Sequence, residues 1–112
     1  MQIDERVIGT VTVLDLKGKI TLNDGDTALR DKINSLMQQD RRSILLNFGG
    51  VPYIDSSGLG EVVRSYTTVS RQNGQLKLVN LTKRITDLLS ITKLLTVFET
   101  FEDEASALKT YT

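Results

Sequence analysis

The chain has 112 residues, enough for one compact domain, and its 14 basic and 14 acidic residues give a formal net charge of zero. This balance supplies no general attraction to nucleic acid or to an anionic membrane, so we expect neither as a partner. Histidine and cysteine are both absent, which excludes Ser-His-Asp and Cys-His catalysis, disulfides and zinc-thiolate sites, and we expect a protein that is not an enzyme and carries no cofactor or metal.

The N-terminal residues have the pattern of two strands and show no targeting signal. Residues 3–7 and 11–17 alternate apolar and polar side chains on either side of a turn at Gly9, which predicts an antiparallel hairpin. Acidic residues occupy the start, where a signal peptide has basic ones. No stretch contains the roughly 18 apolar residues of a membrane span, so we expect a cytoplasmic protein.

A helix and a central strand are predicted next. Either Asp24 or Asp26 can cap a helix that continues to about Gln39. We expect Asp26 and Asp31 on its outer face, because the apolar stripe is formed by Leu29, Ile33, Leu36 and Met37. Residues 43–48, SILLNF, are an apolar run of strand length, which is typical of a strand covered on both faces.

The second half of the chain continues to alternate between strand and helix periods. A helix whose inner stripe begins at Leu59 ends near Asn73-Gly74, where glycine suits the left-handed backbone beyond a helix end. A strand over residues 75–80 and a short helix over residues 82–89 follow. A last short strand is predicted near Val97-Phe98 and a final helix from about Asp103. This order predicts an α/β fold.

The sequence YIDSSGLGEVV places polar residues and glycines at the start of the second long helix. Asp55, Ser56 and Ser57 are expected at the helix N-terminus, where a side-chain oxygen can accept from an unpaired backbone N–H. Gly58 and Gly60 are poor helix formers, and we interpret them as leaving the backbone open to an approaching protein. A phosphoserine here would add about −1.5 to −2 charges where the helix dipole tolerates an anion.

YIDSSGLGEVV, placed after the strand SILLNF, resembles the signature of the STAS domain family, in particular that of bacterial anti-sigma factor antagonists. The resemblance extends over nearly the whole chain, including GKIT after the hairpin, QLKLVN and KRITDLLSITKLLTVF. It implies a single STAS domain over residues 1–112. The implied fold is a mixed β-sheet of four to five strands with about four helices packed mainly on one side.

The resemblance also implies a function and a site. In such antagonists an anti-sigma factor, which is a serine kinase with a histidine-kinase-like ATPase fold, phosphorylates the second serine of the motif, here Ser57. A metal-dependent serine phosphatase removes the phosphate. The unphosphorylated form binds the kinase and frees the sigma factor, and phosphorylation reverses this. Asp55 is expected to help orient the hydroxyl, and the expected partner-binding residues are Tyr53, Asp55, Ser56, Ser57, Gly58, Leu59, Gly60, Thr21 and Asp24.

One segment departs from the pattern of the family. Many antagonists carry acidic residues directly after the glycine that ends the second strand, whereas this chain has Gly18-Lys19-Ile20-Thr21 and its next acids are Asp24 and Asp26. A contact with the kinase is therefore expected to differ here. The free protein is expected to be a monomer or a weak dimer.

Two other functions remain open from the sequence. The chain could be a constitutive STAS adaptor subunit that docks on a lipid-transport ATPase or a signalling scaffold without phosphorylation. It could also be an enzyme that uses Asp55 with Ser57, although no base with a tuned pKa is visible. Nucleotide binding is open as well, but no GxxxxGK[ST] phosphate loop occurs.

Three further groups of residues have both a structural and a functional interpretation. The first group is basic, and it is either a binding patch or part of an ordinary solvated surface: Lys77, Lys83, Arg84 and Lys93. The second group is acidic, and it is either a metal cluster or a set of acids that suits the dipole of the last helix: Glu99, Glu102, Asp103 and Glu104. The third group is apolar and is expected in the core, although an exposed part of it could form a partner groove: Leu88, Leu89, Ile91, Leu94 and Leu95. Tyr53 is a better interface candidate than Tyr66.

Overall fold

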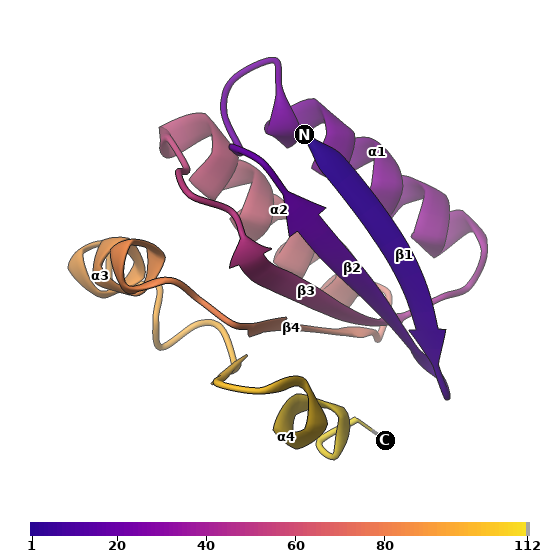
Figure 1. The fold of residues 1–112 in the computed structure, drawn as a ribbon. Helices are drawn as coiled ribbons and strands as arrows, with labels where there is room; N and C mark the ends of the chain where they lie inside the picture. The colour runs from indigo at the N-terminus through magenta and orange to yellow at the C-terminus, as the bar shows by residue number, and fades with distance from the viewer. Residues whose placement is uncertain (112) are drawn as a thin grey trace.

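The computed structural model describes residues 1–111 and contains one five-stranded sheet with the order β1-β2-β3-β4-β5 (Figure 1). The strands are β1 (Gln2–Ile8), β2 (Val11–Lys17), β3 (Ser43–Gly50), β4 (Gln75–Val79) and β5 (Thr100–Phe101). The helices are α1 (Gly25–Gln38), α2 (Ser56–Arg71), α3 (Lys83–Ile91) and α4 (Glu104–Leu108).

The sheet is mixed, and its pairing follows from the lengths of the connections. β1 and β2 are antiparallel, as the short turn at Gly9 predicts. β2, β3 and β4 are parallel neighbours, because α1 and α2 each carry the chain back to the starting end of the sheet. The predicted central strand is confirmed: β3 lies between β2 and β4, and its apolar side chains are buried on both faces.

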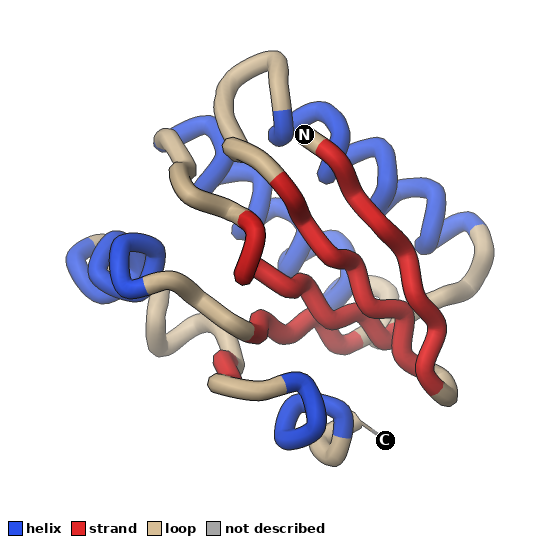
Figure 2. Tube along the Cα trace, in the orientation of Figure 1, coloured by secondary structure: helices blue, strands red, loops and turns tan. Residues whose placement is uncertain are grey.

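Two hydrophobic clusters lie on opposite faces of the sheet. The larger one joins alternate residues of β2 and β3 to the inner stripes of α1 and α2, and it also takes in Ile85 and Leu89 of α3. The smaller one lies under α4 and contains Val11, Val13 and Leu45. Figure 2 shows α1 and α2 behind the sheet and α4 in front of it. This is the fold that the resemblance implied, with most of the helices on one side.

The last strand lies three residues later than the sequence predicts. Val97 and Phe98 are not in a strand: Val97 is exposed, and Phe98 is buried with its ring 5.3 Å from that of Tyr66 in an edge-on arrangement. The strand β5 pairs with Leu78 and Val79 of β4 instead. A buried phenylalanine beside an exposed valine therefore has the same local pattern as a short strand.

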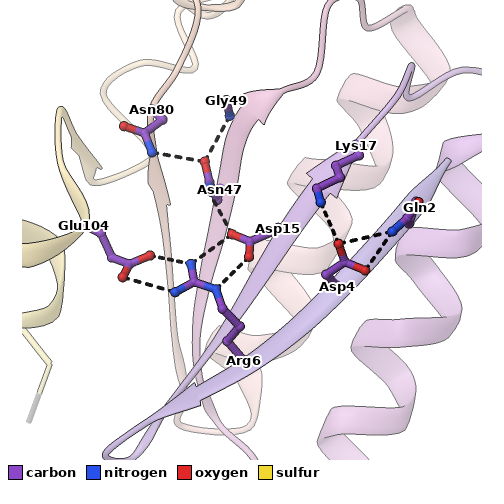
Figure 3. A network of polar contacts seen from close by, with 9 residues as sticks. All are labelled: Gln2, Asp4, Arg6, Asp15, Lys17, Asn47, Gly49, Asn80 and Glu104. Carbon is purple, nitrogen blue, oxygen red and sulfur yellow. Dashed lines mark hydrogen bonds and ion pairs between the residues drawn. The ribbon is translucent and has the colours of Figure 1, made fainter.

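The C-terminal segment, residues 99–111, lies across the face of the smaller cluster. Lys77 of β4 is only 4% exposed there, so it is not part of a surface basic patch. Its Nζ donates to Thr110 Oγ1 over 2.7 Å and forms an ion pair with Glu99 over 3.2 Å. On the same face of the sheet, Arg6 of β1 donates to carboxylate oxygens of Asp15 and Glu104. These contacts link β1, β2 and α4 (Figure 3).

Asp26 is a second charged residue whose position differs from the prediction. It lies in the first turn of α1 and is 5% exposed, not on the outer face. Its Oδ1 accepts from the backbone N–H of Thr27 over 2.6 Å. A hydrogen bond to a neighbouring residue thus compensates part of the cost of burying this carboxylate.

Candidate functional site

The helix N-terminus predicted from YIDSSGLGEVV is formed at Asp55. Asp55 has an extended backbone and occupies the N-cap position of α2. Its Oδ1 accepts from the backbone N–H of Gly58 over 2.8 Å, and its Oδ2 accepts from that of Leu22 over 3.1 Å. These backbone donors, that of Gly58 first, hold the pKa of the Asp55 carboxyl below its usual value of 3.8. Asp55 is therefore ionised at neutral pH.

The loop of residues 19–24 is fixed against the start of α2. The backbone N–H of Ile20 donates to Tyr53 O over 3.1 Å, and that of Asp55 donates to Ile20 O over 3.2 Å. Ile20 and Ile54 form an isolated parallel bridge. Figure 2 shows the two connecting loops side by side, beyond the ends of β2 and β3. The 19–24 loop and the D-S-S-G turn thus form one continuous surface.

Gly58 and Gly60 have different surroundings. A Cβ at Gly58 would lie 2.0 Å from Ile20 O, so glycine is required there for the close approach of the 19–24 loop, and not for access by a partner as the sequence suggested. A Cβ at Gly60 would meet nothing within 4 Å. Gly60 is exposed and remains compatible with the approach of another protein.

The two serines occupy the first two positions of α2. Ser56 is exposed and Ser57 is half-buried. Among residues 1–111, no side chain forms a hydrogen bond with the Ser57 hydroxyl, and Asp55 turns its carboxylate to backbone N–H groups. The expectation that Asp55 orients the Ser57 hydroxyl is therefore not met in this structure. Its visible role is to fix the backbone that carries the serine.

A groove lies between the start of α2 and α3. It has a volume of about 610 Å³, and apolar side chains form much of its lining, including Leu59 and Leu88. Arg84 lies over the ring of Tyr53, with 5.5 Å between its guanidinium carbon and the ring centroid. Ile91 is 79% exposed at its edge, so part of the leucine-rich series does form a groove, as one interpretation of the sequence allowed.

Leu22 was not predicted as a site residue. It is 62% exposed in the 19–24 loop, on the surface that also carries Thr21 and Asp24. Thr21 is half-buried, and its carbonyl accepts from the Asp24 backbone N–H over 3.0 Å in the turn before α1. Asp24 is exposed and forms a 3.4 Å ion pair with the amino group of Met1. A leucine within the polar run TLNDG was the available signal.

The acidic group does not form a metal site in the described part of the chain, and the basic group does not gather into one patch, because Lys77 is buried and Arg84 lies over Tyr53. Asp103 caps α4 by accepting from the backbone N–H of Ser106, and Glu104 pairs with Arg6. Within residues 1–111 no cluster of three or more acidic residues is arranged to hold a metal ion. Lys83 pairs with Asp87 on the surface of α3. No helix among these residues has the length and hydrophobicity to cross a bilayer.

Known proteins resemble this chain in sequence and in fold. The anti-sigma-B factor antagonist of Bacillus subtilis (strain 168) is 43% identical over 68 residues, which are 59% of this chain and 60% of that protein. The match thus spans less than two thirds of that relative. TM1081 of Thermotoga maritima, a candidate anti-sigma factor antagonist, superposes with a TM-score of 0.89 at 19% identity, covering 96% of this chain and 92% of that one.

A further similar structure is that of the Bacillus cell fate determinant SpoIIAA in its phosphorylated form. Its TM-score is 0.75 at 19% identity, covering 98% of this chain and all of that one. At such low identity these two structures establish the fold alone. A protein-family model described as the STAS domain matches residues 2–107. Since this match covers nearly the whole chain, the protein belongs to the STAS domain family, as the DSSGLG motif predicts.

Proposed function

We propose that this protein is an anti-sigma factor antagonist in a partner switch. The unphosphorylated form binds an anti-sigma serine kinase, which then releases its sigma factor. Phosphorylation of Ser57 ends the complex, and a metal-dependent phosphatase restores it. The name of the Bacillus subtilis relative supports the role of antagonist, and the phosphorylated form of SpoIIAA supports control by phosphate.

The position of Ser57 is the observation that carries the proposal. It lies in the first turn of α2, where backbone N–H groups lack helical partners and the dipole favours negative charge. Exposed apolar side chains surround this turn: Leu22 is 62% exposed and Tyr53 is 40% exposed. An acceptor hydroxyl thus lies within a surface that has the composition of a protein interface.

The electrostatics of the turn explain how a phosphate would act. Asp55 is ionised at neutral pH because backbone N–H groups stabilise its carboxylate. A phosphate on Ser57 would add about −1.5 to −2 charges two residues away, in the same turn. The helix N-terminus tolerates this charge, so the fold persists. A partner surface that packs against Leu22 and Tyr53 would instead face two adjacent anionic groups and would be released.

Mass spectrometry of the protein purified from its native cell under phosphatase inhibition tests the proposal. We expect a species heavier by about 80 Da, mapped to Ser57 by fragmentation. The species should be absent from Ser57→Ala and retained in Ser56→Ala, which is the matched control in the neighbouring position of α2. Its absence under all growth and stress conditions would contradict phosphorylation control.

Binding to an anti-sigma kinase captured from the native cell supplies the second part of this test. Ser57→Ala should retain the complex whether or not ATP is present, and Ser57→Asp should lose it because a negative charge then stands permanently beside Asp55. Circular dichroism of both variants checks that the fold is unchanged. A complex that survives Ser57→Asp and does not respond to ATP would instead identify a constitutive adaptor.

A further inference from the structure

The two edges of the sheet differ. β1 is an edge strand of seven residues, paired on one side with β2 along its whole length. Its sequence QIDERVI contains neither proline nor lysine, and no register shift interrupts its pairing. Natural proteins commonly use these devices to protect an edge. At the opposite edge, β5 has only two residues. The long open backbone of the sheet therefore lies along β1, which carries three charged side chains but no proline, lysine or bulge.

The side chains of β1 alternate between the two faces of the sheet. Glu5 points to the side of the long helices, because Lys32 of α1 lies 3.4 Å from its carboxylate. Arg6 points to the other side, where it contacts Glu104 of α4 (Figure 3). Ile3 and Val7 therefore share the face of Glu5, and the remaining members of the strand, Gln2, Asp4 and Ile8, share the face of Arg6.

β1 also carries exposed apolar surface that no described part of the chain covers. Val7 is 52% exposed and Ile8 is 37% exposed, and both lie at the end of the strand next to the turn. An edge strand with free hydrogen-bonding groups and exposed β-branched side chains has the properties of a surface that adds another strand.

We propose that β1 pairs with β1 of a second copy of this chain, antiparallel and centred on Glu5, so that the two sheets become continuous. The two-fold axis is perpendicular to the sheet, which makes the contact isologous. Ile3 then lies opposite Val7 of the other copy, and Asp4 lies opposite Arg6. Each of these pairs occurs twice across the axis. The strand is thus complementary to itself in hydrophobicity and in the order of its charges, and the Asp4–Arg6 contacts would extend ion pairs that each copy already forms with Lys17 and Asp15.

The two neighbouring registers lack this complementarity. A two-fold axis perpendicular to the sheet brings together residues of the same face, so the centre must fall on a residue. A centre on Asp4 places Ile3 against Glu5, and a centre on Arg6 places Glu5 against Val7 and Asp4 against Ile8. The Glu5 centre brings two carboxylates together, but each already has Lys32 of its own copy beside it. The four charges at the axis therefore balance.

The dimer is expected to be weak and to leave the D-S-S-G turn free. One strand pair buries less than the roughly 1,200–2,000 Å² of a stable protein complex, so the dimer should be populated at high protein concentration. The D-S-S-G turn follows β3, which is two strands away from β1, whereas the 19–24 loop reaches the start of β1 through the ion pair of Asp24 with Met1. Dimerisation therefore does not depend on the proposed switch.

Single-cysteine cross-linking tests the register, because the natural chain contains no cysteine. Residues directly opposite in an antiparallel pair have Cβ atoms about 4.5–5.5 Å apart, close to the separation in a disulfide. We expect Glu5→Cys to form a disulfide-linked dimer at least about tenfold faster than Thr10→Cys, an exposed control in the neighbouring turn. Equal rates, or faster cross-linking of Asp4→Cys or Arg6→Cys, would overturn the proposal.

Sedimentation of two lysine variants tests the edge without cross-linking. Val7→Lys places a charge on the exposed edge and should keep the protein monomeric at concentrations where the natural chain dimerises. Val97→Lys is the control, since Val97 is 41% exposed away from β1, and it should dimerise normally. A natural chain that is monomeric at every concentration, or identical behaviour of the two variants, would refute the pairing. Phosphorylation of Ser57 should persist in both, so the two proposals fail separately.

Discussion

At the scale of single residues, Gly58 and Gly60 share a helix but have opposite requirements. A Cβ at Gly58 would lie 2.0 Å from the carbonyl oxygen of Ile20, whereas Gly60 faces open space. Gly58→Ala should therefore lower the free energy of unfolding by about 1–3 kcal/mol through overpacking. Gly60→Ala should raise it by up to about 1 kcal/mol through better helix propensity. Urea denaturation measures both, and changes of the same sign would contradict the close approach of Ile20.

The Asp55 cap predicts a dependence of stability on pH. The pKa of its carboxyl is lower in the folded protein than in the unfolded chain, so the unfolded chain binds the proton first as the pH falls. The stabilisation by Asp55 is complete above its usual pKa of 3.8 and is lost as the pH falls through the lower folded value. Asp55→Asn should therefore be less stable than the natural chain at pH 7, and the difference should shrink towards pH 2.

The midpoints of urea denaturation at several pH values between 7 and 2 measure the difference in stability between Asp55→Asn and the natural chain. Asp31→Asn, which changes an exposed aspartate on α1, is the control and should show no such convergence. A difference between Asp55→Asn and the natural chain that stays constant from pH 7 to pH 2 would show that the charge of the cap does not contribute.

At the scale of elements, the C-terminal segment is held on the sheet by side chains more than by its own short helix. α4 has five residues, and the Tyr111 hydroxyl donates to the carbonyl oxygen of Ile44 in β3. The Tyr111 ring lies 4.8 Å from Nζ of Lys77. Burial raises the pKa of the Tyr111 hydroxyl, which therefore stays protonated and able to donate at neutral pH.

Tyr111→Phe isolates this anchor, because it removes the hydroxyl and keeps the ring. We expect a loss of about 1 kcal/mol of stability, the usual contribution of one such hydrogen bond. Hydrogen exchange should become faster in residues 99–111 and stay unchanged in α1. Tyr53→Phe, at an exposed position, should change neither quantity. Acceleration spread evenly over the whole chain would contradict a local anchor.

At the scale of the whole molecule, the sequence predicts whatever is encoded by local periodicity. The hairpin, the central strand and the helix capped by Asp55 follow from patterns within about ten residues, and the structure confirms them. The burial of Asp26 and Lys77 does not follow from such patterns. Hydrogen-bond partners compensate the cost of burying these charged groups. Those of Lys77 come from the distant C-terminal segment.

The site is predictable to a similar extent. Asp55 could be placed at a helix N-terminus because capping is a local property. The requirement for Gly58 could not be predicted, since it depends on Ile20, which lies 38 positions earlier and reaches α2 through the parallel pairing of β2 and β3. Leu22 becomes part of the surface for the same reason: the loop that carries it is positioned by long-range backbone contacts.

The unequal edges of the sheet also limit how far these molecules can associate. A sheet with two open edges can add copies at both ends and grow into a fibre. In this protein the only long edge strand among the described residues is β1, and the opposite edge ends in the two-residue β5. Pairing through β1 would consume the open edge of both copies. Association would then stop at two molecules, and polymerisation would be prevented by the same contact that forms the dimer.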